Sequence, residues 1–182
     1  MGYSHSFTIQ PGHDIYASMW PGLLEDAVTI VDAVKAKGIE INGPSGLGTP
    51  RLHPSRGIAF NGSRIAGSQC DSFHLDSPAP IAGADRSCRR YRYVKTDANP
   101  YDLAVCAVLL RMKMLMPDIV AVGNPGVWDD TAAGRSLVVD LFGGPDPGPD
   151  LFADPTDGLV LSLSGWVDPQ LLEQAGGPAG SR

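Results

Sequence analysis

The chain has 182 residues, of which 43% are hydrophobic and 19% are charged, a composition that suits one compact domain with a buried core. Its 20 acidic and 14 basic residues give a net charge of -6, which argues against general nucleic-acid binding through phosphate neutralisation. No apolar run is long enough to span a bilayer, and the first residues lack a signal-peptide pattern. The sequence therefore predicts a soluble cytoplasmic protein that does not engage membranes.

Hydrophobic periodicity and turn residues predict the elements of the first half of the chain. A strand is expected over residues 3–9, and a helix over residues 23–37 begins after Pro21 and Gly22. Ile39 and Ile41 would form a very short strand before a loop rich in glycine and proline. Further strands are expected over residues 56–60, 64–66, 70–75 and 89–95, with Asn61-Gly62 as a hairpin turn between the first two.

The second half is predicted to contain two more helices. The helix over residues 100–116 is apolar almost all round and should be buried, with Asn99 as its N-cap and Pro100 in its first turn. A strand over residues 119–122 and a helix from Asp129 or Asp130 to residue 142 follow.

Strands grouped apart from about three helices indicate an α+β fold with a mostly antiparallel sheet. This domain would cover residues 1–143. Residues 144–182 would form a Pro/Gly-rich C-terminal extension, with an edge strand at 159–163 and a short helix at 169–174.

No motif specifies a metal, a cofactor or a nucleophile. The four histidines are scattered, without the spacing of a zinc site, and the three cysteines form no CxxC pair. The glycine-rich residues 43–50 lack the features of a phosphate-binding loop. We therefore expect neither a metal nor a cofactor.

Basic and aromatic residues are concentrated in residues 86–95. On a strand, Tyr91, Tyr93 and Lys95 share one face. Lys95 and Thr96 then come just before a helix N-terminus, where backbone N–H groups could hold a phosphate or carboxylate. The alternative is a solvated basic edge strand, whose charges discourage aggregation.

His5 and Asp102 are the remaining candidates for acid–base chemistry. Histidine exchanges protons near neutral pH, although a hydrogen-bonded strand histidine would explain His5 as well. Asp102 is explained by its place in the first turn of a helix, or it acts beside Lys95 as a general base or orienting group.

Three phrases carry a resemblance to a family: Met1-Gly2-Tyr3-Ser4-His5, then the phenylalanine-asparagine-glycine phrase at 60–62, then Lys95-Thr96 followed by Pro100-Tyr101-Asp102. They resemble an uncharacterised family of small bacterial and phage-encoded proteins, with an MGYTHYW-like start, a central FNG and an FCKTARKPYD-like stretch. The chain departs from the family by Ser4-His5-Ser6-Phe7 at the start and at residues 97–99, where Asp-Ala-Asn replaces Ala-Arg-Lys. The resemblance covers residues 1–142 and implies positions without a mechanism; these positions are Tyr3, His5, Asn61, Lys95, Thr96, Tyr101 and Asp102.

The leading hypothesis is a metal-independent enzyme or binding domain for a small anionic, nucleotide-like ligand, acting by hydrolysis or group transfer. His5, Lys95 and Asp102 would be catalytic; the ligand would be bound by Tyr3, Asn61, Tyr91, Tyr93, Thr96 and Tyr101. The alternative is a non-catalytic protein of a mobile element that binds a protein partner or sequesters a ligand. Nucleic-acid binding through residues 86–95 is the weakest of the three, and base rates favour a homodimer if the chain self-associates.

Overall fold

The computed structural model describes residues 3–78, 89–123 and 128–148. These residues form an α+β fold with three α-helices, one short 3-10 helix and antiparallel strands. The elements in chain order are β1 (Ser4–Ile9), α1 (Asp14–Ala36), β2 (Arg51–His53), β3 (Gly57–Phe60), β4 (Phe73–Leu75), β5 (Arg90–Lys95), α2 (Asp102–Leu115), β6 (Ala121–Gly123), η1 (Trp128–Thr131) and α3 (Ala132–Phe142).

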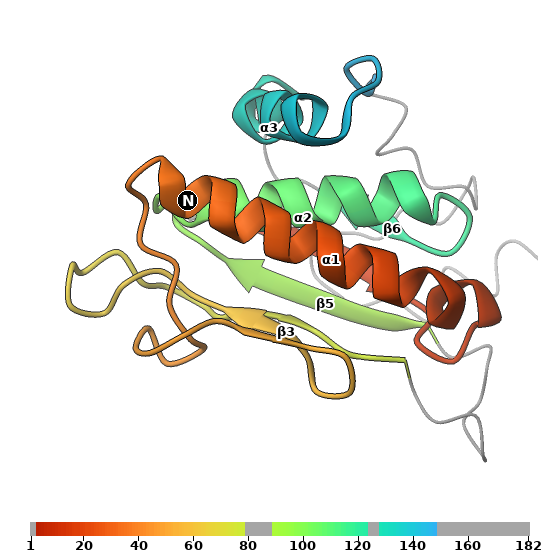
Figure 1. The fold of residues 1–182 in the computed structure, drawn as a ribbon, viewed down its shortest axis with the longest axis horizontal. Helices are drawn as coiled ribbons and strands as arrows, with labels where there is room; N and C mark the ends of the chain where they lie inside the picture. Colours follow the sequence, from red (N-terminus) through yellow and green to blue (C-terminus); the bar gives the residue numbers. More distant parts are fainter. Residues whose placement is uncertain (1–2, 79–88, 124–127, 149–182) are drawn as a thin grey trace, which may run out of the picture.

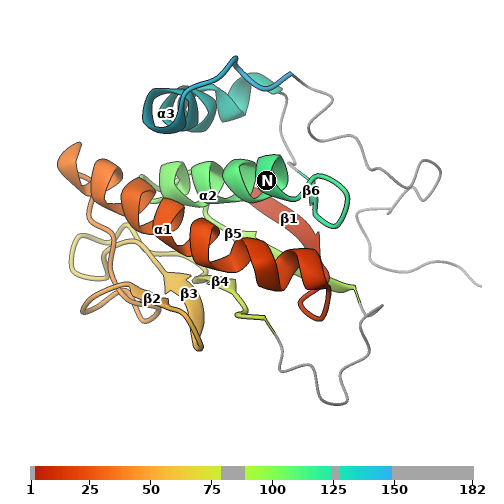
Figure 2. The same cartoon turned by 45° about the vertical axis from the view of Figure 1, so that its right-hand side comes forward.

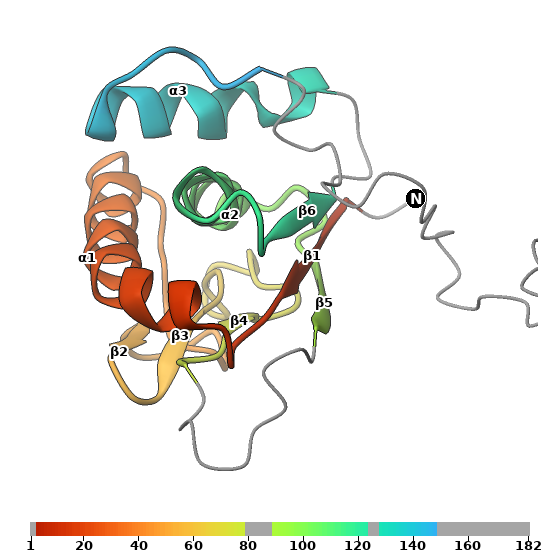
Figure 3. The same ribbon diagram turned by 90° about the vertical axis from the view of Figure 1, so that its right-hand side faces the viewer.

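The strands form two small antiparallel sheets rather than one. The first has the order β5-β1-β6, and the second has the order β2-β3-β4. The second sheet lies beside α1 (Figure 2). Viewed along α2, the first sheet lies on one side of that helix and α3 covers it from above (Figure 3).

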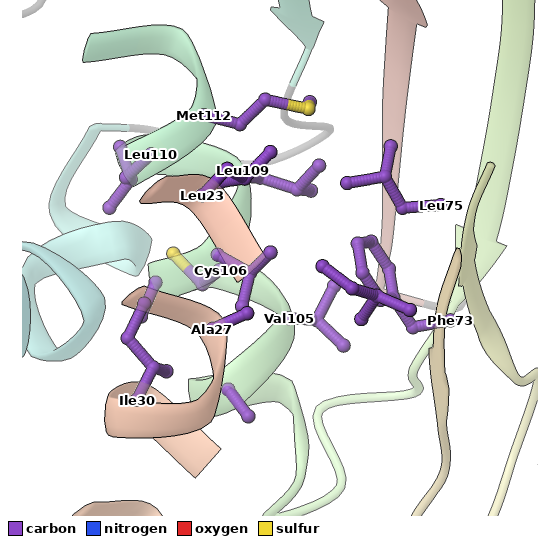
Figure 4. Packing of buried hydrophobic residues seen from close by; sticks show 14 of the residues in the cluster. Leu23, Ala27, Ile30, Phe73, Leu75, Val105, Cys106, Leu109, Leu110 and Met112 are labelled. Atoms are coloured by element: carbon purple, nitrogen blue, oxygen red, sulfur yellow. The ribbon is translucent and has the colours of Figure 1, made fainter. Parts of the chain in front are cut away.

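Helix α2 is the buried centre of the fold, as its all-round apolar sequence predicts. It lies beside α1 above the strands (Figure 1), and its buried positions include nine of its 14 residues. Leu23 and Ala27 of α1 and Val105 of α2 face Phe73 of the second sheet (Figure 4). One continuous hydrophobic core therefore joins both sheets to the helices.

Helix α1 begins at Asp14, nine residues before the predicted start at Leu23, and it contains Pro21 in its interior. Proline inside a helix costs about 3 kcal/mol, so tertiary contacts must offset that cost. The first two turns supply them, because Tyr16 and Trp20 are buried and bind the backbone oxygens of Asp76 and Pro54 at 2.6 and 2.8 Å. The expected boundary was wrong because packing outweighs the local signal of Pro21.

The predicted hairpin at Asn61-Gly62 is also wrong. Residues 64–66 lie in a turn and form no strand; β3 instead pairs with β2 and β4. The backbone of Asn61 pairs with Asn42 in an isolated bridge, which is all that remains of the strand expected near Ile41. The side chain of Asn61 organises the loop that follows, as described below.

Neither helix start expected in the second half has the predicted cap. The N-cap position of α2 is Tyr101, and the Asn99 side chain donates to the Thr96 oxygen at 2.8 Å instead. Helix α3 is preceded by η1, which contains Asp129 and Asp130, so that Thr131 holds its N-cap position.

The strand and helix predicted at 159–163 and 169–174 lie outside the described residues. No helix among the described residues has both the length and the apolar character needed to cross a membrane.

Candidate functional site

A buried group of polar side chains joins the start of β1 to the start of α2. His5 Nε2 lies 2.7 Å from Asp102 Oδ1, and the Thr96 hydroxyl donates to the same oxygen at 2.5 Å. The His5 side chain is 2% exposed and that of Asp102 is 18% exposed. We call His5, Thr96 and Asp102 the dyad site, since Thr96 supports a histidine–aspartate pair.

The chain builds this site through one sheet register and one tight turn. The backbone N–H groups of Thr96 and Asp97 both donate to the Tyr3 oxygen at 3.0 Å, which extends the pairing of β1 with β5. Asp97 and Ala98 then adopt φ values of 51° and 55°, and Asn99 N donates to Thr96 O at 3.0 Å. Positive φ at both central residues is the signature of a type I′ turn, which returns the chain toward Asp102.

The hydrogen bonds fix where the protons of the dyad site lie. A carboxylate can only accept, so His5 Nε2 carries the proton that points at Asp102. Thr96 holds the carboxylate from a second direction. No hydrogen bond forms at His5 Nδ1 within the described part of the chain, which leaves its lone pair able to take a proton.

Tyr3 forms one wall of the site. Its ring meets the His5 ring edge to face, with centroids 5.3 Å apart and planes at 83°. Its hydroxyl lies 3.4 Å from the Asp130 oxygen in η1. Tyr3 therefore links the His5 ring to η1.

Lys95 and the two exposed tyrosines lie on the other face of the sheet. Cross-strand partners share a face, and Lys95 is opposite Ser4 whereas Val94 is opposite His5. Tyr91 and Tyr93 share the face of Lys95 and are 57% and 55% exposed. The structure thus brings His5, Asp102 and Thr96 together and separates them from Lys95, Tyr91 and Tyr93.

The predicted anion corner at Lys95 is occupied by the protein itself. The Lys95 ammonium lies 3.0 Å from an Asp97 carboxylate oxygen, and this hydrogen bond raises the pKa of Lys95. The N–H groups of Asp102 and Leu103 donate to the oxygens of Asn99 and Pro100. These groups of the helix start are therefore not available to an anion.

Asn61 and Tyr101, two of the predicted ligand-binding residues, are buried and form hydrogen bonds with backbone groups. The Asn61 side-chain nitrogen donates to the Cys70 oxygen, and its Oδ1 accepts from the backbone N–H groups of Gly62 and Cys70. The Tyr101 hydroxyl donates to the Asp71 oxygen at 2.7 Å, and burial raises its pKa well above the usual range. Both residues shape the surroundings of the site from inside the fold.

The arginines of β5 are paired with one carboxylate. Arg92 and Arg90 lie 2.7 and 3.1 Å from Asp76 Oδ2. Partial burial raises the pKa of Asp76, but the two guanidinium groups outweigh it and hold that pKa below its ordinary value. Asp76 thus offsets one of the two positive charges that Arg90 and Arg92 carry.

Arg135, which the sequence analysis did not single out, is a buried charged residue of α3. It is 8% exposed on the buried face of α3, and a side chain on the neighbouring Gly134 would meet Cys106 Sγ at 2.5 Å. Burial, helped by the negative charge of Asp102 and opposed by the positive charge of Arg135, raises the pKa of Cys106 to about 12. The sequence could have indicated this burial, because Arg135 lies three and seven residues before the apolar Val138 and Phe142 and so shares their face of the predicted helix.

The described residues include no group of three or more His, Cys, Asp or Glu side chains that could hold a metal ion. A shallow depression of about 410 Å³ lies between the end of α1 and the loop before β2, lined by Lys35 and by parts of residues 38–50. It contains none of the predicted site residues.

No family model, curated protein or solved structure matches the chain. The functional argument therefore rests on the geometry of the dyad site.

Proposed function

We propose that the chain is an enzyme that uses His5 as a general acid–base on a small anionic substrate, by hydrolysis or group transfer and without a metal. The observation that carries the proposal is the 2.7 Å contact between His5 Nε2 and Asp102 Oδ1 inside a nearly closed site. A carboxylate fixed in this way orients the imidazole and stabilises its protonated form when the other nitrogen accepts a proton.

In a hydrolysis, His5 Nδ1 would remove a proton from water as the water attacks the substrate, and would return that proton to the leaving group. Asp102 would accept the His5 N–H throughout, held in place by the hydroxyl of Thr96. Tyr3 would exclude water on one side of the imidazole. In this proposal Asp102 orients His5 rather than acting beside Lys95.

Product release from p-nitrophenyl phosphate, p-nitrophenyl acetate and nucleoside triphosphates tests the proposal. We expect turnover of at least one compound, and we expect His5→Gln to reduce it by about 100-fold or more while the far-UV spectrum stays unchanged. His74→Gln, an exposed histidine on β4, is the matched control and should retain turnover. Turnover that survives in His5→Gln would contradict the proposal.

A second candidate function is the binding of a protein partner through the outer face of the first sheet. Tyr91 and Tyr93 are exposed there beside the half-buried Ser6 and Thr8, and exposed tyrosines are enriched in binding surfaces. Tyr91→Ala with Tyr93→Ala should then abolish co-purification of a host protein without loss of folding. An unchanged set of co-purified proteins would refute this alternative.

A further inference from the structure

We propose that Arg51 is the centre of a separate anion site, on the outer face of the second sheet, that binds the phosphate group of a small molecule beside His74. This inference goes beyond the proposed function, because the outer face of that sheet points away from the helices. His5, in contrast, lies on the core side of the first sheet together with Phe7 and Val94.

The register of the second sheet places Arg51 and His74 in one row. Both residues are cross-strand partners of Ala59 on β3, so all three side chains lie on the same face. Phe73 and Leu75 point toward α1 and α2 (Figure 4), and the alternation of a strand therefore turns His74 outward. Two strand spacings, about 10 Å, separate the Cα atoms of Arg51 and His74. Because Ala59 is buried, an anion would lie above it, against the ends of the two flanking side chains.

The Arg51 guanidinium lacks a partner within the part of the chain that the structure describes. It forms no ion pair with those residues, and its Nε is buried without a hydrogen-bond acceptor. A buried donor without an acceptor is destabilising, and more so when the group is charged. An oxyanion bound side-on accepts from Nε and from one Nη, so it would satisfy this donor and offset the charge.

The charges around His74 are mainly positive. Partial burial lowers the pKa of His74 and the charge of Arg51 lowers it further, while Asp76 raises it and Arg92 lowers it. Asp76 already pairs with Arg90 and Arg92. The local balance is therefore one carboxylate against three guanidinium groups. An anion beside Arg51 would counter this repulsion and let the His74 ring take a proton.

A phosphate group suits this pair better than a carboxylate does. A guanidinium pairs with both oxygens of a carboxylate in one plane, whereas a tetrahedral phosphate keeps further oxygens that can accept from the ring of His74. Free phosphate and a phosphate monoester share this chemistry, and the experiment below distinguishes them.

The pKa of His74, read from the NMR shifts of its ring protons, tests the inference in the full chain. Sulfate is the probe, because it has the shape and charge of a phosphate dianion and does not titrate near neutral pH. At an ionic strength matched with chloride, saturating sulfate should raise the pKa of His74 by about one, so that protonated His74 favours sulfate about tenfold. An unchanged pKa of His74 would overturn the inference.

Arg51→Gln should abolish this response to sulfate. Arg64→Gln removes the same charge from an exposed turn and is the matched control, which should keep the response. An equal response in these two variants would overturn the inference. Saturable shifts of the Arg51 and His74 amides in the unaltered chain need no variant, and their absence would also overturn it.

Competition at pH 8 identifies the source of the phosphate group. Tighter displacement of sulfate by phenyl phosphate than by inorganic phosphate would assign a monoester, and equal displacement would assign free phosphate. Displacement by neither would overturn the inference. His5→Gln should leave the sulfate response unchanged, whatever its effect on turnover; loss of the response in that variant would place the anion at the dyad site instead and would contradict the separate site.

Discussion

The contact between His5 and Asp102 can be measured as a coupling free energy. Asp102→Ala leaves the His5 N–H and the Thr96 hydroxyl buried without their acceptor, at about 1 to 3 kcal/mol each. His5→Phe removes only the bond to His5. Because a hydrogen bond to a charged group contributes about 1.5 to 3 kcal/mol, the double variant should be more stable than the sum of the single changes by about that amount.

Urea unfolding at neutral pH supplies the four free energies of unfolding for this cycle. The matched control is the cycle between Arg90 and Asp76, a contact of 3.1 Å whose side chains are 45% and 38% exposed. Solvent screening should limit the coupling of that pair to below about 1 kcal/mol. A coupling between His5 and Asp102 no larger than that of the control would refute the buried pair and the mechanism built on it.

Three other properties follow from individual contacts. Ala98→Gly should stabilise the protein by up to about 1 kcal/mol in urea unfolding, because alanine is strained at a φ of 55°. Asp76→Asn should make the free energy of unfolding depend less on pH in acid. The folded pKa of Asp76 lies below its unfolded value of 3.8, so the contribution of Asp76 to stability is present above that pH and is lost as the pH falls below it. Unfolding of both proteins at pH 3 and pH 6 would measure the difference. Gly134→Ala should destabilise the protein by about 1 to 3 kcal/mol through its clash with Cys106, and adding Cys106→Ala should restore the melting temperature.

The sequence predicted best where one local signal agreed with burial. The apolar residues of α2 predicted a buried central helix, and the structure confirms it. The start of α1 could not be predicted, because Tyr16 and Trp20 offset Pro21 only through contacts with distant loops. The hairpin turn at Asn61-Gly62 was predicted wrongly for a similar reason. An asparagine before a glycine is typical of a hairpin turn, whereas the Asn61 side chain binds Cys70, nine residues later in the chain.

The site was predicted only in part, because the sequence gives the residue types but does not show which face of the fold each side chain lies on. His5, Thr96 and Asp102 were each candidates, and the pairing of β1 with β5 brings them together. Lys95 precedes Thr96 directly, yet strand alternation turns it to the opposite face. Arg135 was not singled out, because the burial of this charged residue follows from the packing of α3 on α2, which only the tertiary structure defines.

The central claim is that Asp102 holds the His5 imidazole with its proton on Nε2 and leaves Nδ1 to accept another. Nitrogen-15 NMR of the four histidine rings tests it most directly. The account predicts that one ring, assigned to His5 by its loss in His5→Gln, has a slowly exchanging Nε2 proton that becomes fast in Asp102→Ala. A His5 ring that exchanges rapidly between its two neutral forms in the unaltered protein would contradict the account.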